Sequence, residues 1–495
     1  MVNYQPCATV WEVTMGCNMR CKHCGSACQS SLPGELTTKE ALDLCNQLAS
    51  LGVKLVTLSG GEPLLRDDWD KIAHHLSTLG VQPLIVSNGW LVDEPMVERI
   101  HAARIATFAV SLDGLRDTHN YMRCEGSFEK AVSALRLLVN SGVNAAVITT
   151  INKRNISELG AMKNLLNEIG VGSWQLQIAT PMGSFHSHKD ELMIDTAQVS
   201  DIINFAYKVK DDIDIHLGDC VGYYSNKEYE VRKTILPNEN ALWQGCGAGK
   251  TSLGVLHNGD IIGCNSIRSS DFIEGNIREK PLKEIWEKGF SWNRNFSRKN
   301  LSGFCSDCQY ANYCLGGCPN MRLCLNGTID SDNPFCMYHC NLNRAFADIQ
   351  LDSLDFANFD YILKSANEEK NYNLVIMLVE AYLKESPNMP AAQTLYLLNC
   401  LHYAYFQVEH YEKSKMVCEA TLEICKNNPY ALHGLILNLF RTGETEAALE
   451  QLNTLSQLDA MQYKETILDL YTMSSQLVTS TPEVETLKSL AEAFV

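Results

Sequence analysis

The strongest constraint on the fold is the alternation of strand-like and helix-like segments in the first part of the chain. The apolar, strand-like segments are residues 7–15, 54–59, 82–88, 104–112, 143–152 and 173–180. The amphipathic, helix-like segments between them are residues 37–52, 67–80, 93–103, 127–142 and 155–170. Such alternation is typical of a parallel sheet with helical crossovers, and near-continuous apolar strands indicate faces covered by helices. The pattern predicts an α/β fold, a partial (β/α)6 TIM-like barrel.

Cysteines gather in the loop that follows the first predicted strand. The segment CNMRCKHC places Cys17, Cys21 and Cys24 within eight residues. Active sites of parallel α/β sheets lie at the carboxyl ends of the strands, which is where this loop falls. Three thiolates on one short loop can hold three corners of an iron–sulfur cube and leave one iron open. A structural zinc site completed by a ligand from elsewhere is the alternative for this spacing taken alone.

Composition limits the compartment and the partners. The chain has 58 acidic and 41 basic residues, a net charge of −17, which argues against a nucleic-acid partner. No apolar run reaches the roughly 18 residues that a membrane span needs, and the N-terminus lacks the pattern of a signal peptide. We therefore expect a cytoplasmic protein without a membrane partner.

In a reducing cytosol, 20 cysteines indicate metal ligation, catalysis or packing rather than disulfides. Packing is the expected role of Cys45, Cys400, Cys418 and Cys425, which stand singly in helical patterns.

The rest of the chain falls into two further regions. Residues 246–345 have little regular periodicity and nine cysteines, of which Cys324 and Cys340 lie off the spacing pattern of the other seven. Metal clusters would supply the cross-links that such a segment lacks. Helical stretches follow at residues 372–387, 391–406, 409–429, 430–444 and 445–459. Helix pairs that end in Ser-Pro or Asn-Pro are similar to tetratricopeptide repeats, and a plain helical domain is the alternative. The predicted domains are residues 1–215, 216–345 and 346–495, the last of them all-α.

The loop after the second predicted strand reads Ser59-Gly60-Gly61-Glu62-Pro63. A CxxxCxxC segment after the first strand and GGEP after the second resemble the radical S-adenosylmethionine (radical SAM) superfamily. The resemblance implies that Cys17, Cys21 and Cys24 hold a 4Fe–4S cluster whose open iron binds the amino and carboxylate groups of SAM. It also implies that Glu62 accepts a hydrogen bond from the SAM ammonium and that His23 lies near the adenine. Gly60 and Gly61 would let the backbone approach the ligand, beside Pro63.

Further candidates for SAM contacts follow later strands. They are Ser87 and Asn88, Ser111 and Asp113, and the weaker candidate Gln177. His119 and Arg123 also fit a pattern frequent among maturases of the superfamily. Cys124 stands where that pattern often has glycine, so it is a candidate hydrogen-atom donor, with packing as the alternative.

The second group of cysteines resembles the seven-cysteine SPASM domain of radical SAM enzymes that mature peptides and proteins. The resemblance implies two auxiliary 4Fe–4S clusters in this irregular domain. The family pattern assigns Cys246, Cys264 and Cys318 to the first cluster, and Cys305, Cys308, Cys314 and Cys336 to the second. The first cluster lacks an obvious fourth ligand. Cys220 is the candidate and Asp219 the alternative; an open iron that binds substrate is a third reading.

The resemblance therefore implies an enzyme with three 4Fe–4S clusters and SAM that generates a 5′-deoxyadenosyl radical. The expected reaction is hydrogen abstraction from a ribosomally synthesised peptide or protein, giving a thioether or carbon–carbon cross-link or an epimerisation. A flavodoxin- or ferredoxin-type electron donor is an expected partner, and a separate leader-binding protein could assist. An anaerobic sulfatase-maturating enzyme is the alternative, although Asn265 stands where such enzymes have an acidic residue. A non-catalytic iron–sulfur scaffold with a helical adaptor is a further alternative, and the intact Glu62 counts against it.

Overall fold

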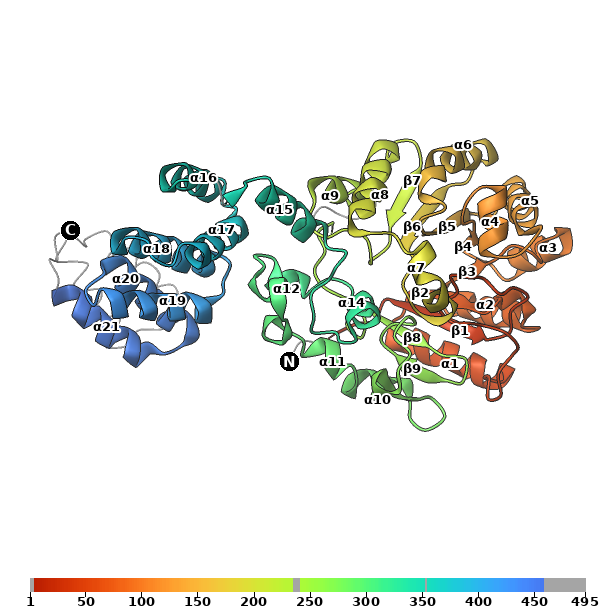
Figure 1. Cartoon of the computed structure of the whole chain (residues 1–495). Coiled ribbons are helices and arrows are strands. Elements are labelled where there is room, and N and C mark those ends of the chain that lie inside the picture. Colours follow the sequence, from red (N-terminus) through yellow and green to blue (C-terminus); the bar gives the residue numbers. More distant parts are fainter. Residues whose placement is uncertain (1–3, 235–240, 352–353, 458–495) are drawn as a thin grey trace. The chain divides into compact units, whose positions relative to one another are not determined.

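A computed structural model describes residues 4–234, 241–351 and 354–457 (Figure 1). The chain divides into two compact units. We call the first the barrel unit, Met1–Ser306 with Asn312–Cys340, and the second the helical unit, Asp307–Ala311 with Asn341–Val495. The division into three domains at residues 215 and 345 stays a prediction.

A parallel sheet forms the centre of the barrel unit (Figure 1). Its first seven strands are β1 (Ala8–Thr14), β2 (Leu55–Gly60), β3 (Gln82–Ser87), β4 (Thr107–Ser111), β5 (Ala145–Ile151), β6 (Ser173–Ile178) and β7 (Asp214–Leu217). Each pairs in parallel with the next, which confirms the predicted α/β fold and the six predicted strands. The strand β7 was not predicted, because its four residues Asp-Ile-His-Leu lack a continuous apolar run.

The region with the second group of cysteines extends the same open sheet. The strand β8 (Ser252–Val255) pairs in parallel with β1, and β9 (Asp260–Ile262) and β10 (Ile273–Asn276) continue it antiparallel. Short helices follow: α10 (Leu282–Lys288), α11 (Ser291–Arg294), α12 (Gly303–Asp307), α13 (Ala311–Cys314) and α14 (Pro319–Asn326). Helices this short bury little apolar surface, as expected of a region stabilised in another way.

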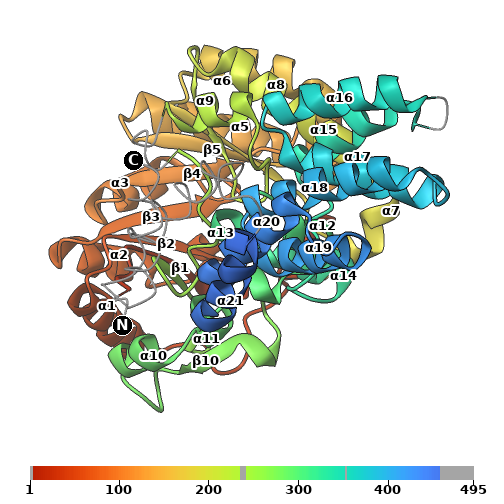
Figure 2. The ribbon, with the colours of Figure 1, turned by 90° about the vertical axis from the view of Figure 1, so that its left-hand side faces the viewer.

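Amphipathic helices cover one face of the parallel strands (Figure 2). They are α1 (Thr38–Leu51), α2 (Trp69–Thr78), α3 (Glu94–Ala102), α5 (Ser127–Asn140), α6 (Leu159–Ile169) and α8 (Thr196–Val209). Thr37 and Glu40 form a capping box at the start of α1, and Gly52 ends this helix in the left-handed conformation, as the sequence predicts. The buried face joins Trp11, Phe108 and Trp174 of the strands to the apolar stripes of the helices in one core.

The other face of the strands mixes polar and apolar side chains. Because side chains alternate along a strand, residues between the core positions share this second face. Leu84, Val86 and Ile148 are half-buried apolar members of it. Its half-buried residues with hydroxyl or amide groups are Thr57, Ser59, Ser111, Thr150, Gln175 and Gln177, and we call it the polar face after them. This face adjoins the loops at the carboxyl ends of the strands, where the predicted site residues lie.

Successive helices build the helical unit. They are α16 (Phe356–Glu368), α17 (Tyr372–Glu385), α18 (Ala391–Gln407), α19 (Tyr411–Ile424), α20 (Pro429–Thr442) and α21 (Thr445–Gln457). Each packs on the next, as in a series of helical hairpins (Figure 2). The predicted stretches match α17 to α21, and the last two residues of the fifth stretch lie outside the described residues. The repeat assignment stays a prediction.

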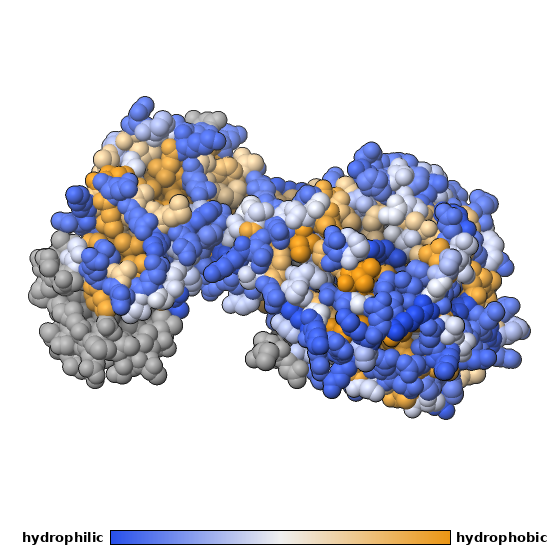
Figure 3. All heavy atoms as spheres, turned by 90° about the horizontal axis from the view of Figure 1, so that it is seen from below, coloured by the Kyte–Doolittle hydropathy of each residue, from blue (hydrophilic) through white to orange (hydrophobic). Residues whose placement is uncertain are grey.

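The surface of the protein mixes hydrophilic and apolar patches. In the view of Figure 3, hydrophilic side chains interrupt the apolar areas. In residues 4–234, 241–351 and 354–457, no helix combines the length and the apolarity that a bilayer crossing requires.

Candidate functional site

Cys17, Cys21 and Cys24 lie on the irregular loop between β1 and α1, at the carboxyl end of β1. Burial raises the pKa of Cys21 to about 12, and the neighbouring Cys24 and Cys17 add to the increase. The three thiols are thus neighbours on one loop, and three neighbouring cysteines are the donor set that a cluster with one open iron needs.

The segment that follows β6 supports the cysteine loop from the side. The backbone N–H of Ser184 donates to the carbonyl of Cys24 at 2.9 Å. A Cβ atom on Gly183 would lie 2.4 Å from the same carbonyl, and one on Gly25 would lie 3.3 Å from the Met182 side chain. Only glycine fits this approach. The loops after the first and the sixth strands thus meet, as expected for a common carboxyl edge.

Gly60 and Gly61 bring the second loop against the first. A Cβ atom on Gly61 would lie 2.0 Å from the carbonyl oxygen of Gly16, and one on Gly60 would lie 2.2 Å from that of Thr14. Gly60 also has a φ of 125°. These glycines thus permit close contact with the backbone that leads to Cys17, and their approach to the ligand stays a prediction. The buried Pro63 then begins a short 3-10 turn.

Glu62 is almost fully buried and accepts hydrogen bonds from two strand ends. Its Oε1 accepts from the Ser87 hydroxyl at 2.8 Å, and its Oε2 accepts from the Asn88 backbone N–H at 2.8 Å. The Leu64 N–H donates to Oε1 at 3.2 Å. Burial raises the pKa of Glu62 although these bonds oppose the increase. A buried carboxylate with an acceptor position left over is suited to an ammonium group.

Asn88 contacts the cysteine loop, and His23 is part of this loop. The Asn88 amide donates to the side chain of Asn18 at 2.7 Å, which ties β3 to the cysteine loop. His23 places Nε2 3.1 Å from Oδ2 of Asp113. Its Nδ1 is buried and has no partner among the described residues. The His23 ring is thus fixed through Nε2, and its Nδ1 atom is available to a ligand.

Asp113 and Arg123 form a buried ion pair beside the cysteines. The Nε atom of Arg123 lies 2.6 Å from Oδ2 of Asp113, and its Nη1 lies 3.8 Å from Sγ of Cys21. Burial disfavours the charged Asp113, but Arg123 and His23 outweigh burial and hold the pKa of this carboxyl far below its usual range. The Thr150 N–H donates to the other Asp113 oxygen at 2.8 Å. Asp113 therefore orients Arg123, whose guanidinium has the charge and shape to bind a carboxylate.

His119 completes this group. Its Nδ1 accepts from the Asp113 backbone N–H at 3.0 Å. Burial, followed by the nearby Arg123, lowers the pKa of His119 to about 3, so the ring is neutral. The sequence pattern pointed to His119 and Arg123, but the contact of Arg123 with Cys21 has no signal in the sequence.

Ser111 and Gln177 lie on the polar face of the strands, close to its carboxyl edge. Gln177 donates to the Thr150 hydroxyl at 3.0 Å and accepts from the Gln175 amide at 3.4 Å. Cys124 follows Arg123 and is half-buried, and burial raises the pKa of its thiol. A thiol that keeps its proton is what a hydrogen-atom donor requires, and this role stays a prediction.

Cys28 is a neighbour of the cluster loop that the spacing analysis did not single out. Its buried thiol donates to the carbonyl of Gly60 at 3.5 Å. A further hydrogen bond from Cys28 is the main cause that lowers the pKa of Cys24. Cys28 therefore supports the thiolate form of a predicted ligand.

The cysteines assigned to the first auxiliary cluster lie together with Cys220. Burial raises the pKa of Cys318 well above its usual value, and the neighbouring Cys220, Cys246 and Cys264 add to the increase. Asp219 is close enough to raise the pKa values of Cys246 and Cys264. The Cys220 sulfur accepts from the backbone N–H of Ile178 at 3.4 Å, which positions it at the end of β6. The predicted fourth ligand thus stands beside the three others, with Asp219 next to it.

Three of the cysteines assigned to the second auxiliary cluster lie in the barrel unit. They are Cys305, Cys314 and Cys336. Burial raises the pKa of Cys305 to about 12, and the nearby Asp332 and Cys336 add to the increase. The backbone N–H of Cys305 donates to the Asp332 carboxylate at 2.6 Å. Cys308 belongs to the helical unit.

Glu12 and Arg268 connect β1 with the region that follows β9. The Arg268 guanidinium pairs with Oε1 of Glu12 and donates to the Ser26 hydroxyl at 2.6 Å. Ser26 follows Cys24 by two residues, so this pair lies next to the cluster loop. Burial lowers the pKa of Arg268 to about 10. Oε2 of Glu12 and Nε of Arg268 are buried without a partner in the described residues. Because 256 positions separate the two residues, sequence spacing could not reveal the pair.

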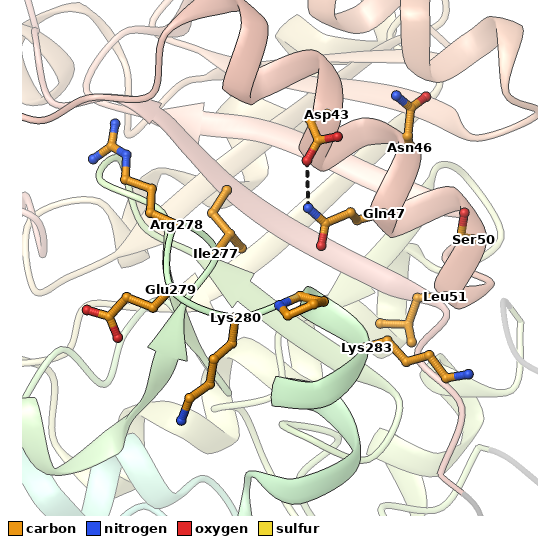
Figure 4. A pocket seen from close by; sticks show the side chains of 11 residues that line it. Asp43, Asn46, Gln47, Ser50, Leu51, Ile277, Arg278, Glu279, Lys280 and Lys283 are labelled. Atoms are coloured by element: carbon orange, nitrogen blue, oxygen red, sulfur yellow. Dashed lines mark hydrogen bonds between the residues drawn. The ribbon is translucent and has the colours of Figure 1, made fainter.

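A separate pocket of about 510 Å³ lies on the surface between α1 and residues 277–283 (Figure 4). Asp43, Gln47 and Lys283 are among its lining residues, and Gln47 donates to Asp43 at 2.7 Å. No cysteine or other predicted site residue lines this pocket. It therefore has no part in the chemistry of the cysteine loop.

Comparisons with known proteins agree with this geometry. The family "Radical SAM superfamily" matches residues 11–166, and "Iron-sulfur cluster-binding domain", the SPASM family, matches residues 246–309. AdoMet-dependent heme synthase of Methanosarcina barkeri is 30% identical over 344 residues, which cover 67% of this chain and 97% of the relative. Mycofactocin maturase MftC of Mycolicibacterium smegmatis is 24% identical and covers 67% of this chain and 83% of the relative.

Solved structures share the fold of the barrel unit. Streptococcus suis SuiB bound to S-adenosylmethionine has a TM-score of 0.55 at 18% identity and covers 67% of this chain and 76% of its own. Native anSMEcpe with bound AdoMet and a Cp18Cys peptide has a TM-score of 0.54 at 17% identity and covers 69% and 97%. The two family matches confirm 4Fe–4S clusters and SAM as the cofactors. The chain therefore belongs to the radical SAM superfamily of enzymes, in the group that carries a SPASM domain.

Proposed function

We propose that this radical SAM enzyme modifies a ribosomally synthesised peptide or protein. The product would carry a thioether or carbon–carbon cross-link or an inverted stereocentre. Relatives of the chain include a mycofactocin maturase, and SuiB has been solved with its precursor peptide SuiA. These likenesses support a peptide substrate.

The polar face of the strands carries the proposal. Its hydroxyls and amides (Thr57, Ser59, Ser111, Thr150, Gln175 and Gln177) can both donate and accept hydrogen bonds, as a peptide backbone requires. Of the cations near this face, Arg268 is paired with Glu12, and we assign Arg123 to the carboxylate of SAM. Neither guanidinium is then left for the substrate, which suits a peptide better than a substrate with several carboxylates.

A tetrapyrrole is the second candidate substrate, since the relative that is 30% identical is named a heme synthase. A heme precursor with acidic side chains would call for several unpaired cations. The strand positions of the polar face contain no lysine or arginine. We therefore place the tetrapyrrole second. Sulfatase maturation is a weaker candidate because Asn265 follows Cys264, and a scaffold would have no use for the buried Glu62.

The residues of the site fit the cofactors, and we propose the following roles. Cys17, Cys21 and Cys24 would hold the SAM-binding cluster, which together with SAM supplies the 5′-deoxyadenosyl radical. Glu62 would accept from the ammonium of SAM, and Arg123, oriented by Asp113, would bind its carboxylate.

Other side chains around the site would orient the ligands. His23 would contact the adenine through its free face, and Ser87 and Asn88 would keep Glu62 in place. Gln177 and Ser111 would orient the substrate or the cofactor from the strands. The main contribution of the protein to such chemistry is to hold the reacting groups in position.

The auxiliary clusters would accept the electron that leaves the substrate. With Cys220 as the fourth thiolate, the first auxiliary cluster would have no open iron, so the substrate would bind to the protein rather than to this cluster. A flavodoxin- or ferredoxin-type protein would supply the electron for the first step. A separate leader-binding protein is a further proposed partner.

The test compares two substrate classes with one preparation. The anaerobically reconstituted enzyme receives SAM and dithionite, with either short peptides encoded beside its gene or Fe-coproporphyrin III. We expect the peptides to raise 5′-deoxyadenosine formation above the substrate-free rate and to change in mass, and the porphyrin to do neither. Stimulation by the porphyrin with none by any peptide would contradict the proposal. A Cys21→Ala variant, which lacks a predicted ligand of the SAM-binding cluster and should form no 5′-deoxyadenosine, is the negative control.

A further inference from the structure

Residues Asp307–Ala311 belong to the helical unit, although the cysteines on either side of this segment, Cys305 and Cys314, do not. The segment contains Cys308, which is 8% exposed. Two helices of the helical unit, α17 and α19, hold it through side-chain contacts.

Asn373, the second residue of α17, binds the backbone on both sides of Cys308. Its Oδ1 accepts from the backbone N–H of Gln309 at 2.9 Å, and its Nδ2 donates to the carbonyl of Asp307 at 2.8 Å. Asn373 is only 2% exposed. An amide that both donates and accepts is one of the few groups that can satisfy the two backbone atoms at once. Cys308 therefore lies between two backbone groups that one buried side chain fixes.

The carboxylate of Asp307 provides a second connection, to α19. Its Oδ2 lies 2.6 Å from Nζ of Lys413, and its Oδ1 lies 3.2 Å from Nε2 of His410. The Asp307 side chain is 19% exposed, so water screens the pair only in part. The side chains of His410, which caps α19, and of Lys413, in its first turn, thus hold the residue that precedes Cys308.

We propose that Asn373, His410 and Lys413 are positioning residues for Cys308 as a ligand of the second auxiliary cluster. They keep the Asp307–Ala311 segment in the conformation that presents the thiol. These contacts would then be needed to retain this cluster, whatever substrate the enzyme uses. The proposal rests on the predicted ligand role of Cys308 and is independent of the choice between peptide and tetrapyrrole.

The experiment measures cluster retention in the full-length reconstituted enzyme. Asn373→Leu and Lys413→Met are compared with Lys415→Met, which lies on the same helix but pairs with Glu444 away from the segment. The readouts are the rate at which a ferrous chelator removes iron and the EPR signal of the reduced auxiliary clusters. SAM is added in a parallel sample to identify the signal of the SAM-binding cluster.

We expect iron equivalent to one cluster to leave Asn373→Leu roughly 10-fold faster or more, the effect of losing two buried hydrogen bonds. Lys413→Met should show a smaller increase, and Lys413→Arg should restore the original rate. Lys415→Met and the SAM-responsive signal should be unchanged. Equal release rates in Asn373→Leu, Lys413→Met and the control would overturn the proposal. Faster loss from all clusters alike would also overturn it, because it would indicate general unfolding. No substrate enters the experiment, so a wrong substrate class cannot affect its result.

Discussion

The Ser87 hydroxyl donates to Oε1 of Glu62 at 2.8 Å, and the next residue, Asn88, donates its backbone N–H to Oε2. Glu62 follows β2 and Ser87 ends β3, so the carboxylate joins two adjacent strand ends. Its orientation is thereby set before any ligand arrives, which reduces the entropic cost of binding.

Glu62→Gln should weaken SAM binding about 10- to 100-fold, because it replaces a charge-assisted hydrogen bond worth roughly 1.5–3 kcal/mol with a neutral one. The change in the EPR spectrum of the reduced cluster on titration with SAM measures the affinity. Glu40→Gln is the matched control, since Glu40 is paired with Arg278 on the surface. Equal SAM affinity in the two variants would show that Glu62 does not contact SAM.

Gly61→Ala should prevent reconstitution of the SAM-binding cluster, because the new methyl group would lie 2.0 Å from the backbone oxygen of Gly16. The backbone at this position can move away from the new methyl group only if the start of the cysteine loop also moves. The control is Gly160→Ala, on the exposed side of α6 with nothing within 4 Å. This change should be neutral or stabilising by up to about 1 kcal/mol. Iron content and urea unfolding of both variants provide the comparison, and full iron in Gly61→Ala would refute the packing argument.

Cys220→Ala should labilise one auxiliary cluster and leave the other signals in place. Iron would fall from about 12 per chain, as expected for three four-iron clusters, towards about 8. Cys45→Ala is the control, because the buried Cys45 thiol packs inside the core and its loss should not change the iron content. If Cys220→Ala retains all its iron, Asp219 becomes the better candidate for the fourth ligand.

Stability of the helical unit should decrease as the pH falls from about 6.5 to about 4. Burial, followed by the neighbouring His433, lowers the pKa of His402 from 6.5 to about 4. Between these values the unfolded chain binds a proton that the folded chain excludes, so acid favours unfolding. The effect is on the order of 3–4 kcal/mol at most. Hydrogen exchange at several pH values measures the stability of α18. On acidification this stability should decline less steeply in His402→Gln than in the unchanged chain. Parallel pH profiles would rule out His402 as the cause.

Hydrophobic periodicity was sufficient to predict strands β1 to β6 and most of the helices that follow them. It failed for β7, where Asp214 and His216 interrupt the apolar pattern, and for the short helix α4 (Arg116–Met122), which lacks a long stripe. It also failed between residues 246 and 345, where the short helices α10 to α14 bury too few side chains to show a period.

Spacing predicted the members of the site better than their contacts. Cys220 was predicted as a neighbour of the first auxiliary group, and it lies beside Cys318. The contact of Arg123 with Cys21 and that of Arg268 with Glu12 could not be predicted, because each joins segments more than 100 residues apart. The role of Gly61 also depended on the packing of two loops, which no single segment encodes.

The pairing of β8 with β1 has a consequence for biosynthesis. Because β8 ends at Val255, the outer edge of β1 stays without its partner until more than half of the polypeptide has left the ribosome. An unpaired strand edge is a template for association with other chains. Nascent chains of this enzyme should therefore depend on chaperones during translation, and fragments that stop before residue 252 should aggregate when expressed.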